Sequence, residues 1–231
     1  RVRHLSIRRQ RQMCIRDRVW LGVDVGRVSD LFAITPVIMM DDFWYIESFS
    51  FVATKYGLTA KEKRDGVSYS NLERQGYCEI TTLESGVIDD ERVLEKIEEM
   101  VYTNEWEVNG ICFDPYQFGT LLTMIEKRHP EWPLIEVSQT TMVLNMPTKQ
   151  FRDDLKKGKI KHSGNPLLTM AVNNAYIKTD NNGMRIDKNK NSNKIDPLDA
   201  ALDGYAVCYL EPFDGSGYWT SEKILGGETL F

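Results

Sequence analysis

The sequence lacks the long apolar runs that would place a protein in a membrane. None of its hydrophobic stretches approaches the roughly 20 consecutive residues that a membrane-spanning helix needs. The first residues lack the apolar middle of a signal peptide, and no internal repeat or low-complexity tract is present. With 231 residues, of which 42% are hydrophobic and 27% are charged, the composition predicts one globular domain that makes no membrane contact.

Cysteine and histidine are scarce, which argues against a metal site built from thiolates or imidazoles. The three histidines and four cysteines show no metal-ligand spacing. Cys112 and Cys208 lie in apolar runs and are predicted to be buried free thiols, which favours a reducing cytosol.

The excess of basic charge is confined to the start of the chain. The first 18 residues hold seven arginines and one aspartate, whereas the remainder holds 22 basic and 33 acidic side chains. Such an acidic body argues against tight nucleic-acid binding over the whole surface, although a local basic track remains compatible with it. The start can be interpreted as a basic arm, but residues 9–18 resemble translated sequencing-adapter sequence. We therefore predict a non-native extension over 1–18, one domain over 19–212 and a loosely ordered tail over 213–231.

Hydrophobic periodicity and turn residues predict a mixed α/β fold. We expect strands over 19–25, 108–113 and 134–137, a hairpin of 31–40 with 43–53, short extended pieces over 79–82 and 85–88, and a hairpin edge over 183–187. We expect helices over 89–103, 116–128, 148–157, 166–178 and 196–210, and a polar insertion over 54–75. This order predicts a mixed sheet flanked by helices on both faces.

Aspartates stand at the edges of three of these elements. Asp24 lies inside the first apolar strand, Asp114 follows the strand 108–113, and Asp196 and Asp199 open the last helix. Asp24 in an apolar strand is rarely structural, because an unpaired buried carboxylate is costly. The other three have a structural alternative: Asp114 precedes a proline and can begin a turn, Asp196 can cap its helix, and Asp199 can favour the helix dipole. Two further aspartates are expected to be structural, Asp30 in a turn and Asp203 as a solvated or capping carboxylate.

The order of these aspartates predicts metal-dependent phosphodiester hydrolysis. Carboxylates that converge repel one another, and a divalent cation between them is the usual resolution. Two ions roughly 3.5–4 Å apart would supply the attacking hydroxide and stabilise the leaving oxygen. Since no histidine or cysteine is needed for Mg²⁺ or Mn²⁺, we expect two such ions on Asp24, Asp114, Asp196 and Asp199, with Asp24 bridging them and the first three residues catalytic.

Basic residues gather in three local clusters. One contains Lys61, Lys63 and Arg64; segment 149–161 carries six basic and two acidic residues, and 178–194 carries five basic and two acidic. A solvated surface is at least as good an interpretation of each cluster alone. The predicted contacts to DNA phosphates are Lys149, Lys157, Lys188, Lys190 and Lys194.

From about Val19 to Leu210 the chain resembles the C-terminal nuclease domain of tailed-phage terminase large subunits. The similarity lies in an ordered set of motifs: 21–26 (LGVDVG), 86–89 (GVID), 113–115 (FDP), Gln139 with 146–147 (MP), 162–166 (HSGNP) with 173–174 (NN), and 194–197 (KIDP) with 199–200 (DA). The resemblance implies an RNase H-like fold and a two-metal endonuclease that cuts concatemeric double-stranded viral DNA during packaging. It also implies that Asp24, Asp114 and Asp196 hold the ions, while the position of Asp199 is acidic only in some relatives.

The same resemblance sets expectations about the complete protein. Family members carry an ATPase motor, whereas this chain contains no Gly-x-x-x-x-Gly-Lys-Ser/Thr motif, so we expect a truncated fragment without the motor. The implied partners are DNA, a terminase small subunit and a portal protein, in the cytoplasm of the infected bacterial host.

Two alternatives remain at this point. An ATP-using phosphotransferase of the actin and sugar-kinase type also begins with a strand carrying Asp-x-Gly, but the residues around Asp114 do not resemble its phosphate or adenosine loops. A DNA-binding or assembly module without catalysis would keep the fold and lose the metals, and the retained aspartates argue against it.

Overall fold

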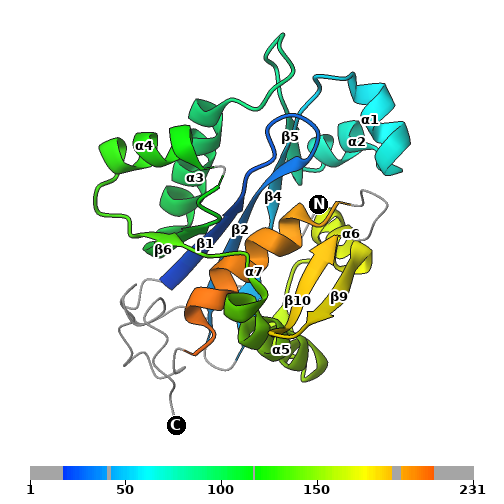
Figure 1. Cartoon of the computed structure of the whole chain (residues 1–231). Helices are drawn as coiled ribbons and strands as arrows, with labels where there is room; N and C mark the ends of the chain where they lie inside the picture. Colours follow the sequence, from blue (N-terminus) through cyan, green and yellow to red (C-terminus); the bar gives the residue numbers. More distant parts are fainter. Residues whose placement is uncertain (1–17, 41–42, 117, 189–193, 211–231) are drawn as a thin grey trace.

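The computed structural model of the protein describes residues 18–40, 43–116, 118–188 and 194–210 (Figure 1). Within this part of the chain, eight strands form one mixed sheet with the order β5-β4-β2-β1-β6-β7, and β3 and β8 extend it beside β2. The strands are β1 (Arg18–Asp24), β2 (Leu31–Met39), β3 (Trp44–Ile46), β4 (Phe49–Val52), β5 (Cys78–Ile80), β6 (Glu107–Phe113), β7 (Leu134–Glu136) and β8 (Ile160–Lys161).

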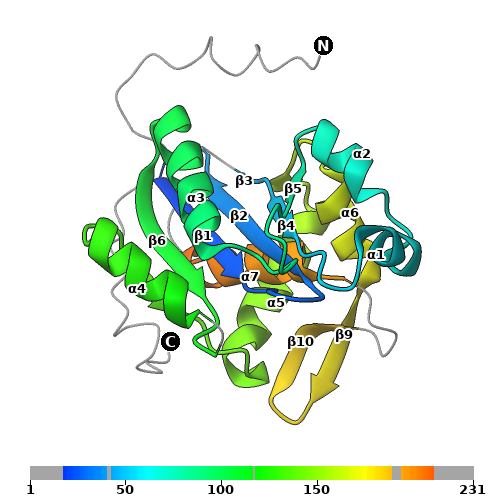
Figure 2. The same cartoon turned by 90° about the horizontal axis from the view of Figure 1, so that it is seen from above.

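Helices cover both faces of this sheet, as predicted. They are α1 (Leu58–Asp65), α2 (Tyr69–Arg74), α3 (Asp90–Asn104), α4 (Gly119–Arg128), α5 (Thr141–Lys156), α6 (Pro166–Asn174) and α7 (Asp196–Cys208). In Figure 2, α3 lies on one side of β1 and β2, and α7 lies on the other. A separate hairpin of β9 (Ala175–Asp180) and β10 (Gly183–Lys188) packs beside α5.

Alternation along β1 explains how both faces are covered. Successive side chains of a strand point to opposite faces. Leu21 and Val23 belong to the hydrophobic core beneath α3 and α4, whereas Trp20 belongs to the core beneath α7. All three side chains are at most 2% exposed, so β1 is buried on both faces and its near-continuous apolar sequence follows from that position.

Helix α7 rests directly on the backbone of β1. A Cβ atom at Gly22 would lie 1.7 Å from the main-chain oxygen of Ala200, and Gly204 also approaches the backbone of β1 closely. Asp196, in the first turn of α7, accepts a hydrogen bond from the N–H of Leu31 at the start of β2, and β2 pairs antiparallel with β1 so that Ala33 lies opposite Asp24. The first turn of α7 is therefore at the end of β1 that carries Asp24.

The structure corrects three of the predicted elements. The helix predicted over 148–157 begins at Thr141 and continues through Pro147, although a proline usually interrupts a helix. The helix predicted over 166–178 ends at Asn174, because the β-favouring Tyr176, Ile177 and Thr179 pair with β10 instead. The third difference lies between β4 and α3, where residues 85–88 form no strand. The insertion 54–75 stays outside the sheet, as predicted, and contains α1 and α2.

Candidate active site

The first two predicted aspartates follow neighbouring parallel strands. Val23 of β1 pairs with Phe113 of β6, so Asp24 and Asp114 come next on the two strands. Asp24 is two residues from Gly22, which faces α7, and Asp114 is two residues from Cys112, which lies in the core beneath α7. By strand alternation, both carboxylates point to the α7 face of the sheet.

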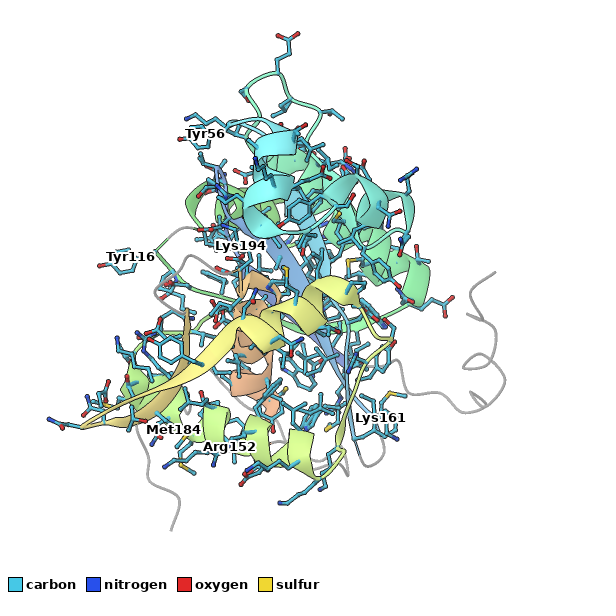
Figure 3. All side chains as sticks on the ribbon, turned by 90° about the vertical axis from the view of Figure 1, so that its right-hand side faces the viewer. Tyr56, Tyr116, Arg152, Lys161, Met184 and Lys194 are labelled. Carbon is cyan, nitrogen blue, oxygen red and sulfur yellow. The ribbon has the colours of Figure 1, made fainter. Side chains whose placement is uncertain are left out.

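Asp114 also shapes the loop behind it. Its Oδ1 accepts a hydrogen bond from the backbone N–H of Tyr116 at 3.2 Å, so the turn suggested by the following proline does form. This turn keeps 114–116 out of the helix, and α4 begins at Gly119 instead of at Tyr116 as predicted. Tyr116 itself is 94% exposed and projects from the molecule beside this site (Figure 3).

The other two predicted aspartates lie in the first turn of α7. The N-cap is Ile195, so Asp196 is the first helical residue and does not cap the helix, and Asp199 follows on the same face. Asp196 is 1% exposed, and its Oδ2 accepts a bond from the backbone N–H of Leu31 at 3.4 Å. The positive end of the α7 dipole favours both negative charges.

Asp203 was wrongly expected to be solvated or capping. Its side chain is 2% exposed, and Gln139 Nε2 donates to its Oδ1 at 2.7 Å. Burial raises the pKa of Asp203 well above its usual value, the bond from Gln139 opposes that rise, and the charges of Asp199 and Asp114 add to it. The end of β6 and the first turns of α7 therefore lie within electrostatic range of one another. In the sequence, the spacing of three and four residues between 196, 199 and 203 could have identified Asp203 as a residue on the same helix face as Asp196 and Asp199.

The described residues do not contain a formed metal centre. No three histidine, cysteine, aspartate or glutamate side chains in this part of the chain stand close enough together to hold one ion. What the fold supplies is two strand ends and a helix start that bring four carboxylates to one face of the sheet.

The predicted DNA-binding lysines lie in different surroundings. Lys157 is exposed after α5 and Lys149 is half-buried within it, while the side chain of Lys188 and all of Lys190 fall outside the described residues. Lys194 is 6% exposed; it donates to the main-chain oxygen of Ser29 at 3.1 Å and forms an ion pair with Asp30. Asp30 does lie in a turn, as expected.

Two further observations concern the whole described chain. Cys78, Cys112 and Cys208 are buried free thiols, which confirms the prediction for the latter two. No helix in the described residues has the length and apolar character needed to cross a membrane.

Comparisons with known proteins agree with this fold. The family model described as terminase large subunit, endonuclease domain, matches residues 8–207, a match that begins within the predicted non-native extension. The terminase large subunit of Enterobacteria phage HK97 is 25% identical over 184 residues, covering 78% of this chain and 36% of that protein.

Solved structures show the same fold. The crystal structure of the HK97 bacteriophage large terminase matches with a TM-score of 0.74 and 22% identity, covering 83% of this chain and 40% of that one. A large terminase structure from a thermophilic bacteriophage matches with a TM-score of 0.53 and 10% identity over 86% of this chain and 40% of that one. These likenesses support the predicted RNase H-like fold. The chain spans about two fifths of the length of each of these matched proteins. With a family model matched over most of its length, the chain belongs to the terminase large subunit endonuclease domain family.

Proposed function

We propose that this domain is a metal-dependent endonuclease that cleaves double-stranded DNA by two-metal hydrolysis. Asp24, Asp114 and Asp196 would hold the ions, and Asp199 would be a further ligand. The observation that carries the proposal is the placement of Asp24 and Asp114 at adjacent parallel strand ends, on the face against which α7 presents its acidic first turn.

The donor chemistry of these residues fits magnesium or manganese. All four side chains are carboxylates, which are the hard oxygen ligands that both ions accept, and neither imidazole nor thiolate is required. When bound, a pair of such ions would activate a water molecule and stabilise the leaving oxygen of the phosphodiester.

The protein's own contribution is to position these carboxylates. The N–H of Leu31 fixes the carboxylate of Asp196, and Gln139 fixes Asp203 behind Asp114 and Asp199. Because the pKa of Asp203 is raised, this residue can stay protonated where ordinary carboxylates are charged. A neutral Asp203 would limit the repulsion inside the group.

The relatives suggest the biological setting of this activity. We propose that the domain cuts concatemeric viral DNA during genome packaging, in the cytoplasm of an infected bacterium, as part of a longer protein with an ATPase motor. A small subunit and a portal protein would be its partners there. Lys149, Lys157, Lys188, Lys190 and Lys194 remain the proposed contacts to DNA.

The first prediction tests catalysis. The purified chain is incubated with supercoiled plasmid and Mn²⁺ or Mg²⁺, and nicked and linear products are measured by gel electrophoresis. We expect Asp24→Ala, or a chelator, to reduce cleavage at least about 100-fold, since the removal of one group that stabilises transition-state charge costs on that order.

A matched control is Asp153→Asn, which removes a carboxylate that is 48% exposed on α5, away from the strand ends. It should cleave like the wild type. Equal cleavage by wild type and Asp24→Ala would reject the proposed function.

A further inference from the structure

Three cationic side chains converge on one main-chain oxygen in the turn between β1 and β2. The oxygen of Ser29 accepts from Lys61 Nζ at 2.5 Å, from Lys194 Nζ at 3.1 Å and from the guanidinium of Arg64 at 3.2 Å. A carbonyl oxygen offers two lone pairs, so three donors exceed what it can accept in good geometry. This cluster, Lys61, Arg64 and Lys194, is called the cation cluster below.

In the described part of the chain, two carboxylates form ion pairs with the three cations of this cluster. Asp65 lies 3.5 Å from Lys61 and 2.8 Å from Arg64, and Asp30 pairs with Lys194. Burial lowers the pKa of Lys61 and the charge of Asp65 opposes this, while the charges of Lys194 and Arg64 lower it further. The cations therefore repel one another at close range, and a bound anion would relieve that repulsion.

A cavity opens beside the cation cluster. It measures about 120 Å³ and lies between α1 and the turn. Its lining is half polar or charged, from Ser29, Tyr56, Lys61 and Arg64, and half apolar, from Val28, Ala53, Gly57 and Ala60. That volume exceeds several-fold the roughly 30 Å³ that a water molecule occupies in the liquid. The side chain of Arg64 is 44% exposed, so its guanidinium is open to a ligand from solvent.

The cation cluster is continuous with the carboxylates of the candidate active site. Leu31, whose N–H binds Asp196, is two residues from Ser29, and Lys194 is two residues before Asp196. In Figure 3, Tyr56 and Tyr116 lie at the same edge of the view, with Lys194 nearer its middle. Because Leu31 and Lys194 join the cluster to Asp196, a strand of nucleic acid bound at the carboxylates would meet the cavity next.

We propose that this cavity binds a backbone phosphate of the DNA strand, next to the phosphate that is cut. The planar guanidinium of Arg64 suits a phosphate, to which it can donate two parallel bonds. Lys61 supplies a charge held within the wall of the cavity, and Tyr56 forms part of its rim. This inference rests on the proposed function, which makes DNA the source of the phosphate.

The second prediction measures binding without cleavage. The full chain carrying Asp24→Asn is titrated into a labelled duplex in metal-free buffer, and the dissociation constant is measured by fluorescence anisotropy between 50 and 200 mM salt. Adding Arg64→Gln should weaken binding about three- to tenfold and reduce the salt slope by about 0.9, the value for one lost phosphate contact. Arg64→Lys should recover part of the affinity while lacking the paired geometry.

The matched control is Lys63→Gln, which removes the same charge from the same helix at an exposed position that does not line the cavity. It should change affinity less than twofold. Circular dichroism establishes that each variant is folded, and the Arg64→Lys comparison carries the test if Arg64→Gln is not.

The inference would be overturned if Arg64→Gln and Lys63→Gln weakened duplex binding equally, or if Arg64→Gln left duplex affinity unchanged. If Arg64→Gln abolished binding of inorganic phosphate while duplex affinity stayed unchanged, the cavity would be assigned to free phosphate. Cleavage is not part of this readout, so an Arg64-specific loss of binding would support the subsite even if the plasmid assay rejected the nuclease.

Discussion

At the scale of single residues, the buried carboxylate of Asp203 shows how far the sequence could be followed. The residue types and their order predicted Asp24, Asp114, Asp196 and Asp199, because strand ends and helix starts can be read locally. The spacing of 196, 199 and 203 could have placed Asp203 on the same helix face as the predicted ligands. Its bond to Gln139, however, joins positions 64 residues apart, and no local pattern predicts that contact. The convergence of Lys61 and Lys194 on Ser29 was hidden for the same reason.

The third prediction concerns the pH dependence of stability at Asp203. Its pKa is raised in the folded state, so the folded protein binds the proton more tightly than the unfolded chain. Consequently, the free energy of unfolding falls as the pH rises from the unfolded pKa of Asp203, near 3.9, toward its higher folded pKa. The fall amounts to at most about 1.4 kcal/mol per pH unit.

Asp203→Asn should remove this loss while leaving an oxygen that accepts from Gln139. Urea unfolding of both proteins from pH 4 to pH 7 measures the difference. The variant should gain stability relative to the wild type as pH rises, and a relative loss across this range would contradict a raised pKa.

At the scale of elements, the position of α7 decides whether a site can form. The sequence predicted the strand and the helix, but not their contact through Gly22, Ala200 and Gly204. Glycine in a strand can indicate close approach of another backbone, yet it equally indicates a bulge, so its partner could not be identified.

The fourth prediction is that Gly22→Ala destabilises the protein strongly. The added Cβ would meet the main-chain oxygen of Ala200 at 1.7 Å, and a backbone cannot yield as a flexible side chain does. We expect a loss of about 3 kcal/mol or more, at or above the upper end for overpacking, measured by urea unfolding. Any folded fraction should cleave poorly, because a displaced α7 moves Asp196 away from Asp24.

A second glycine provides the control. Gly119→Ala adds the same methyl group at the start of α4, where nothing lies within 4 Å of the new atom. It should change stability by no more than about 1 kcal/mol. Similar losses for both variants would mean that the contact with α7 is not the cause.

At the scale of the whole molecule, β2 connects three hydrophobic clusters. Leu31 belongs to the cluster under α1 and α2, Phe32 to the one under α3 and α4, and Val37 to the one under α7. The mixed sheet with helices on both faces was predicted from the order of the elements. Its strand order and the three-way role of β2 depend on pairings between distant segments, which hydrophobic periodicity does not encode.

The fifth prediction follows from this shared strand: the cluster under α1 and α2 and the cluster under α7 should unfold together. Cys78 lies in the first cluster and Cys112 and Cys208 in the third, all as buried thiols. Burial raises the pKa of Cys78 to about 12 and that of Cys112 well above its usual value, so neither reacts readily while folded.

Labelling with a thiol reagent across a urea series, followed by peptide mass spectrometry, measures exposure at each position. Cys14→Ser removes the fourth thiol from the background. The sites should become reactive at the same urea midpoint. Labelling of Cys78 at clearly lower urea would show that the α1–α2 region opens independently, as a separate unit of lower stability.

The contact between Gly22 and α7 has a consequence for how such a domain can tolerate change. Main chain touches main chain there, so the gap between strand and helix does not depend on the bulk of any side group. Neighbouring positions can exchange one apolar residue for another and alter local volume, yet the offset between the acids of β1 and those of α7 stays the same. Gly22 therefore fixes the distance between strand and helix, and substitutions of neighbouring apolar residues should leave the spacing of the carboxylates unchanged.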